Sequence, residues 1–109
     1  MDVEALPDEL AVSIITIGEL RAGVLAASDT TTRDRRLSTL TSVLALGPVP
    51  VDEAVAVSWA RLRSLLRDNR LRMPVNDSWI AATAMSLGVP VVTQDADFPA
   101  LPELAVVHV

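Results

Sequence analysis

The chain has 109 residues, half of them hydrophobic, and a formal net charge of −5. This length allows one domain with a single core, and the apolar content excludes an intrinsically disordered chain. The lack of cysteine excludes disulfides and thiolate metal sites. No apolar run approaches the roughly 18 residues that suggest a membrane span, and the acidic N-terminus is unlike the basic start of a signal peptide. We therefore expect a cytoplasmic protein that has no membrane partner.

Short apolar strands are expected to alternate with helices. Residues 10–15, LAVSII, predict a strand, and apolar residues with helical spacing follow from Ile17 to Leu25. After a polar break, a second helix is expected from about Thr32 to Leu46. Asp52 is then predicted to cap a long helix that ends at about Asp68.

The C-terminal part continues this alternation. Asn76 or Asp77 is expected to open a helix that runs through Ser86 and is terminated by Gly88, because glycine is favoured just after a helix. Residues 89–93 predict the clearest strand, and a last strand is expected over residues 104–109. Strands that alternate with helices predict a parallel α/β sheet with crossover connections.

Acidic residues lie where ligands bind in such a sheet, beyond the carboxyl ends of the strands. Glu19 follows the first expected strand, Asp77 opens the helix NDSWIAATA, and Asp95 and Asp97 follow VPVVTQ. Each acid taken alone has a structural explanation. Thr16 and Glu19 fit a capping box, Asp77 complements the positive end of a helix, and Asp95 fits an Asx turn.

Several carboxylates at one edge of a sheet repel each other and resist desolvation. A divalent cation resolves this conflict, and ligands that are all oxygen atoms favour Mg²⁺ or Mn²⁺ over zinc. Such a site can activate water and stabilise the attacking and leaving oxygens at a phosphate. The acids together therefore predict metal-assisted phosphodiester hydrolysis.

All nine basic residues are arginines, and most of them lie in residues 33–36 and 61–72. The planar guanidinium suits phosphate because it donates two parallel hydrogen bonds. The alternative is a solvated helix face, and the acidic net charge does not itself indicate a nucleic-acid partner. The absence of lysine excludes a P-loop and Schiff-base chemistry.

Three ordered motifs, TIGELRAGV, NDSWIAATA and VVTQDADFP, resemble those of PIN-domain ribonucleases. The sequence is most similar to the VapC branch, the toxins of type II toxin–antitoxin pairs, and the resemblance covers essentially the whole chain. It implies an α/β fold, with a short parallel sheet in a three-layer α/β/α arrangement, in one domain over residues 1–109.

The resemblance also implies the site and its cofactor. Glu19, Asp77 and Asp95 correspond to the acids that bind Mg²⁺ or Mn²⁺ and carry catalysis in the family. Asp97 is implied as a fourth or supporting metal ligand. Thr93 is expected to add a polar contact beside Asp95, and Asn76 is expected to orient Asp77.

The sequence departs from the family pattern at its start. The family opens with an apolar strand that lies centrally in the sheet and ends in a metal-binding Asp. This chain opens MDVEALPDEL, and Asp2 is no replacement because no apolar run precedes it. We therefore expect the first strand to be absent from this chain.

The resemblance implies an endoribonuclease toxin that cuts RNA, such as tRNA or rRNA, and forms a homodimer. A VapB-type antitoxin, whose C-terminal segment enters the active-site groove, would neutralise it. The alternative is a catalytically impaired module that only binds an antitoxin or a second protomer. A phosphoacceptor receiver domain needs a lysine that this chain lacks, and a dinucleotide-binding fold needs a G-x-G-x-x-G motif that it also lacks.

Overall fold

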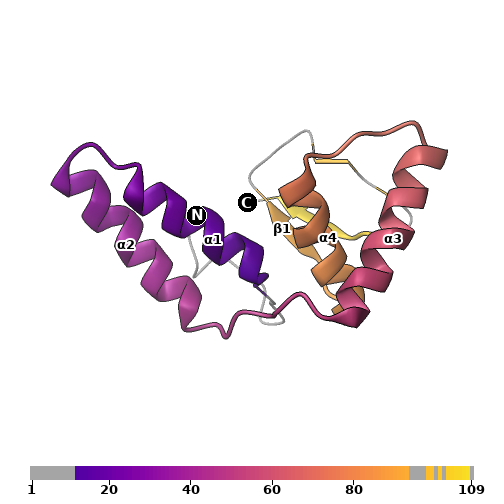
Figure 1. Ribbon diagram of the computed structural model, residues 1–109, viewed down its shortest axis with the longest axis horizontal. Helices are drawn as coiled ribbons and strands as arrows, with labels where there is room; N and C mark the ends of the chain where they lie inside the picture. Colours follow the sequence, from indigo (N-terminus) through magenta and orange to yellow (C-terminus); the bar gives the residue numbers. More distant parts are fainter. Residues whose placement is uncertain (1–11, 94–97, 100, 102, 109) are drawn as a thin grey trace.

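The computed structural model describes residues 12–93, 98, 99, 101 and 103–108. Figure 1 shows its elements, which in chain order are α1 (Ile14–Leu25), α2 (Thr30–Leu44), α3 (Glu53–Asp68), α4 (Val75–Leu87), β1 (Val91–Thr93) and β2 (Val106–His108). None of the helices in these residues is long and apolar enough to cross a lipid bilayer.

The molecule is elongated, with principal extents of 45 × 26 × 25 Å. The α1–α2 hairpin forms one end, and α3, α4 and the two strands form the other (Figure 1). The helices of each end contact one another, and α1 also contacts α4. The contact between α1 and α4 therefore joins the two ends.

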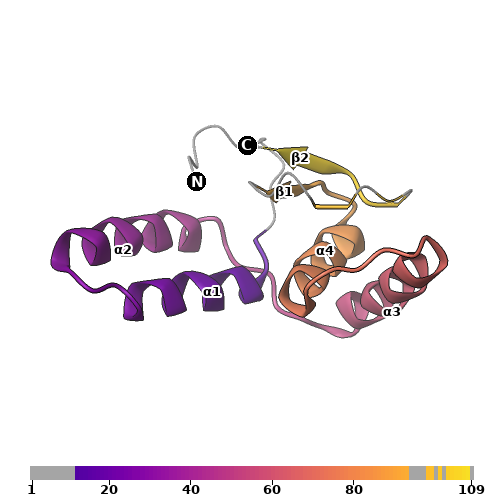
Figure 2. The same cartoon turned by 90° about the horizontal axis from the view of Figure 1, so that it is seen from above.

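The strands β1 and β2 pair in parallel, as expected, with Val91 opposite Val106. Figure 2 shows α3 and α4 on one side of this pair. A separate parallel bridge joins Ser13 to Val49, and the Ile14 amide donates to the Val49 carbonyl at 2.9 Å. The chain just before α1 is thus held against the segment between α2 and α3.

The first helix begins earlier than the sequence indicates. The expected strand over residues 10–15 gives way to α1 at Ile14, because Ser13 caps the helix and its hydroxyl accepts a hydrogen bond from the Ile15 amide at 3.1 Å. Thr16 therefore lies inside α1 and Glu19 lies beyond its first turn. The prediction of a capping box formed by these two residues is wrong.

The other helix ends divide between confirmed and corrected predictions. Asp52 caps α3 by accepting a hydrogen bond from the Val55 amide at 3.0 Å, and Gly88 ends α4 in the left-handed conformation with φ of 66°. Helix α4, however, opens after Pro74, so Asn76 and Asp77 lie within its first turn rather than at its cap.

Two hydrophobic clusters form the core. The larger one joins α3, α4, β1 and the C-terminal segment, and it contains Leu62, Leu66, Ala81, Ala84, Val91, Phe98, Leu101 and Leu104. The smaller one joins α1 and α2 through Val12, Ile17, Leu40 and Val43. Helices α1 and α4 meet between these clusters, where the candidate site lies.

Candidate active site

The structure brings Glu19 of α1 together with the first turn of α4. Partial desolvation raises the pKa of the Glu19 carboxyl above its ordinary value of 4.5, and the negative charge of Asp77 raises it further. A hydrogen bond with the Asn76 side chain acts in the opposite direction. Two of the acids expected from sequence thus share one electrostatic environment, and Asn76 contacts Glu19.

A buried polar contact holds the two helices at this place. The Thr83 hydroxyl of α4 lies 3.4 Å from the Ser13 hydroxyl at the start of α1. It also lies within hydrogen-bond distance of the Trp79 carbonyl, at 2.8 Å. Both hydroxyl-bearing residues are almost fully buried. Each also has a partner near it in the chain, since the Ile15 amide donates to Ser13 and the Trp79 carbonyl accepts from Thr83. The contact at 3.4 Å therefore adds a polar link between α1 and α4.

The opposite side of the first turn of α4 is fixed against α3. The rings of Trp59 and Trp79 stack with centroids 4.5 Å apart. The Trp59 indole N–H donates to the Ser78 hydroxyl at 3.0 Å, and that hydroxyl donates to the Val75 carbonyl. Asp77 is therefore held between two anchored neighbours, Asn76 and Ser78. No local sequence pattern indicates Ser78, because its role depends on a tryptophan 19 residues away.

The remaining predicted acids, Asp95 and Asp97, lie outside the described residues, as does the side chain of Thr93. Only residues 88–90 connect α4 to β1, so the strand runs back along the helix (Figure 1). Its C-terminal end is therefore directed towards the helix end that carries Asp77. Within the described residues, no group of three acidic or histidine side chains could hold a metal ion.

The family profile of the PIN domain matches residues 2–104 of this chain. The chain belongs to the PIN-domain family. This confirms the resemblance seen in the three sequence motifs and the expected fold class.

The similarity extends to individual proteins of the VapC branch. The chain is 48% identical to Ribonuclease VapC4 of Mycobacterium tuberculosis over 101 residues, which cover 93% of this chain and 78% of the relative. It is 47% identical to Ribonuclease VapC5 of the same organism, covering 100% of this chain and 81% of the relative. Among solved structures, it resembles the crystal structure of VapBC-5, a member of the VapBC family of toxin–antitoxin systems from M. tuberculosis. The TM-score is 0.86 at 43% identity, covering 100% of this chain and 89% of that one.

Proposed function

We propose that this chain is a VapC-type toxin, an endoribonuclease that hydrolyses RNA phosphodiester bonds with Mg²⁺ or Mn²⁺. The high identity to two ribonucleases over nearly the whole chain supports the reaction class. The observation that carries the assignment of the site is the proximity of Glu19 on α1 to Asn76 and Asp77 in the first turn of α4.

The residues present suit a divalent cation. A raised carboxyl pKa means that the charged form is disfavoured when no cation compensates it. Carboxylate oxygens are the ligands that Mg²⁺ and Mn²⁺ prefer. In this proposal Glu19 and Asp77 hold the ion, together with Asp95 and Asp97, which the sequence motifs indicate. The ion, when bound, supplies water activation and charge stabilisation at the phosphate.

The protein itself positions these groups. Asn76 contacts Glu19, and the Ser13–Thr83 contact links the two helices. The first turn of α4 has no side-chain cap, so its amide groups and the helix dipole favour an anionic group such as a phosphate at this end.

The partners follow from the same assignment. The similarity to the VapBC-5 structure supports a VapB-type antitoxin that neutralises the enzyme. We also propose that the chain acts in the cytoplasm on cellular RNA, such as tRNA or rRNA, and that it forms a homodimer.

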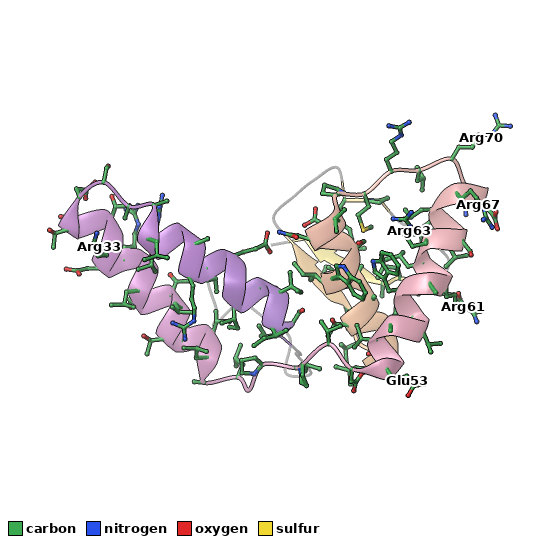
Figure 3. All side chains as sticks on the ribbon, in the orientation of Figure 1. Arg33, Glu53, Arg61, Arg63, Arg67 and Arg70 are labelled. Carbon is green, nitrogen blue, oxygen red and sulfur yellow. The ribbon has the colours of Figure 1, made fainter. Side chains whose placement is uncertain are left out.

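Substitution of Asp77 by Asn tests the proposal. Cleavage of single-stranded RNA in the presence of Mg²⁺ should fall by more than about 100-fold, since even the outer contacts of a metal site contribute 10–100-fold. Thermal stability without metal should change little. The matched control is Glu53→Gln, an exposed acid in the first turn of α3 (Figure 3), which should cleave like the wild type. Wild-type cleavage by Asp77→Asn would refute the site.

A further inference from the structure

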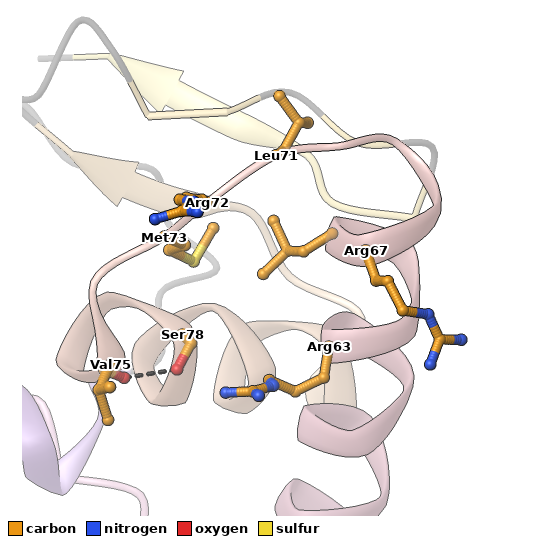
Figure 4. A pocket seen from close by; sticks show the side chains of 8 residues that line it. Arg63, Arg67, Leu71, Arg72, Met73, Val75 and Ser78 are labelled. Carbon is orange, nitrogen blue, oxygen red and sulfur yellow. Dashed lines mark hydrogen bonds between the residues drawn. The ribbon is translucent and has the colours of Figure 1, made fainter.

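A pocket of about 300 Å³ lies between α3, the first turn of α4 and the connecting segment of residues 69–74 (Figure 4). Its apolar lining comes from Leu66, Leu71, Met73 and Val75. Three arginines, Arg63, Arg67 and Arg72, also line it. A pocket of this size, part apolar and part cationic, is large enough for one small organic group with a negative charge.

The arginines of residues 61–72 differ in their surroundings. Arg61 forms an ion pair with Glu103 on the surface. Arg67 lies 3.4 Å from Asp68, and it points away from the pocket in Figure 4. Arg63 extends towards α4, near Ser78, and Arg72 lies on the connecting segment (Figure 4). Arg63 and Arg72 are therefore the two pocket-lining arginines that form no ion pair with another described residue.

Arg63 is also held in place. Its guanidinium lies 5.1 Å from the centroid of the Trp59 ring, a distance that gives a cation–π attraction. A guanidinium with one face on an aromatic ring keeps its N–H groups directed sideways, where they can bind a phosphate. The Trp59–Trp79 stack thus orients the arginine as well as the helix.

The pocket and the acidic pair share one turn of α4. Ser78 lines the pocket, and Asp77 is its neighbour in the sequence. Successive helical residues are about 100° apart around the axis, so Ser78 lies against α3 while Asp77 acts on Glu19 of α1. A polymer that crosses this turn can therefore reach both places.

We propose that the pocket binds one nucleotide of the RNA strand beside the scissile phosphate, with the phosphate on Arg63 and Arg72 and the base against the apolar lining. The inference rests on the proposed function. Guanidinium forks match phosphate oxygens, and bases outside a stack are held on arginine planes or between aromatic or apolar side chains. An acidic peptide would use the arginines but not the apolar lining, so the composition of the pocket favours single-stranded RNA.

The test measures RNA binding without cleavage. A short fluorescein-labelled single-stranded RNA of mixed sequence is titrated in EDTA and followed by fluorescence anisotropy. The double variant Arg63→Gln/Arg72→Gln should bind about tenfold more weakly, and the slope of log Kd against log salt should fall by about 0.7 for each phosphate that the variant no longer neutralises. The matched control, Arg33→Gln/Arg35→Gln, removes the same charge from two exposed arginines of α2, at the other end of the molecule (Figure 1). Its affinity should stay within about twofold, because neither arginine is placed to neutralise the bound phosphate.

Equal affinities of the double variant and its control would overturn the proposal. So would a variant that loses affinity for an acidic peptide but not for RNA, since this would assign the pocket to a protein partner. If the double variant melts at a lower temperature, Arg72→Gln alone decides the question, because Arg72 lies outside the helices. It should still weaken RNA binding, and unchanged affinity would refute the subsite.

The subsite and the nuclease can fail separately. If the wild type binds RNA through Arg63 and Arg72 but never cleaves it with Mg²⁺, the subsite stands and the proposed reaction falls. If the wild type cleaves RNA while the double variant keeps its affinity, the reaction stands and the subsite falls.

Discussion

Among single residues, Glu19 has the environment that bears most directly on function. It lies where desolvation and a second carboxylate both oppose its charge, while Asn76 partly offsets them. A structural carboxylate in a helix would normally gain from its neighbours, as Asp29 does. That residue caps α2 and accepts hydrogen bonds from the Thr32 amide and hydroxyl, which lower its pKa. This contrast agrees with the metal-binding role that we propose for Glu19.

The pKa of Glu19 should respond to both neighbours in metal-free protein. Asp77→Asn removes a negative charge and should bring the pKa back towards 4.5, whereas Asn76→Ala removes a hydrogen bond and should raise it further. The folded protein binds this proton more tightly than the unfolded chain. Glu19 therefore lowers the free energy of unfolding as pH rises from 4.5 through its folded pKa, and Asp77→Asn should flatten that slope. NMR titration of the Glu19 carboxyl carbon measures the shift, and an unchanged value in both variants would contradict the proximity.

Ser78 is expected to contribute to stability through its buried hydroxyl. Ser78→Ala removes the acceptor for the Trp59 indole N–H, which lies 3.0 Å away. We expect a loss of about 1 kcal/mol in the free energy of unfolding, measured by urea denaturation. Ser42 is the control, because its exposed hydroxyl contacts only the carbonyl of Ser38 in its own helix. Ser42→Ala should be neutral, and an equal effect of the two substitutions would argue against the role of the indole contact.

At the scale of whole elements, the sequence predicts helices well where local chemistry decides their ends. The predictions for Asp52 and Gly88 are confirmed, because each residue ends its helix through its own side chain or backbone. The predicted start of α1 is wrong because two hydroxyl residues, Ser13 and Thr16, could each cap the helix. The preference for Ser13 depends on partners that are distant in the sequence. Ser13 meets Val49 in a bridge and Thr83 in a buried contact, and neither is visible in a local pattern.

This competition gives a prediction about the start of α1. Ser13→Ala should cost about 1–2 kcal/mol, because it removes the helix cap and a buried hydroxyl that contacts Thr83. Thr16→Ala removes the hydroxyl that a capping box would need, and it should cost less than about 0.5 kcal/mol, because Thr16 lies inside α1, where alanine favours the helix. Thermal or urea unfolding of both variants measures these changes. A larger effect at Thr16 than at Ser13 would restore the capping box and refute the observed helix start.

The candidate site was partly predictable for a related reason. Alternating strands and helices bring the acidic motifs to one edge, which is how Glu19 and Asp77 could be paired from sequence. The pocket could not be found this way. It depends on separating Arg61, whose ion pair spans 42 residues, from Arg63, which is held on a tryptophan ring. Asp95 and Asp97 lie outside the described residues, so their roles stay predictions.

At the scale of the whole molecule, two separate clusters of buried residues are joined where α1 contacts α4. Glu19 belongs to the helix hairpin at one end, and Asp77 belongs to the unit at the other end. The candidate site thus lies where α1 contacts α4, between the two ends of the molecule, rather than inside either cluster. Without a cation, the repulsion between its carboxylates acts against the contact that holds the two ends together.

A divalent cation should therefore stabilise the folded chain, since it would compensate the charges of Glu19 and Asp77 where α1 contacts α4. A ligand that binds only the folded state at 100 times its Kd adds about 2.7 kcal/mol to the free energy of unfolding. In differential scanning fluorimetry, Mg²⁺ or Mn²⁺ should raise the Tm of the wild type and of Glu53→Gln by the same amount. Glu53 lies at the start of α3, away from the acidic pair (Figure 3). Asp77→Asn should lose most of this rise while its Tm in EDTA stays equal or increases, because its repulsion with Glu19 is gone. An equal rise in all three proteins would place the cation elsewhere and remove the physical basis for the acidic pair as a metal site.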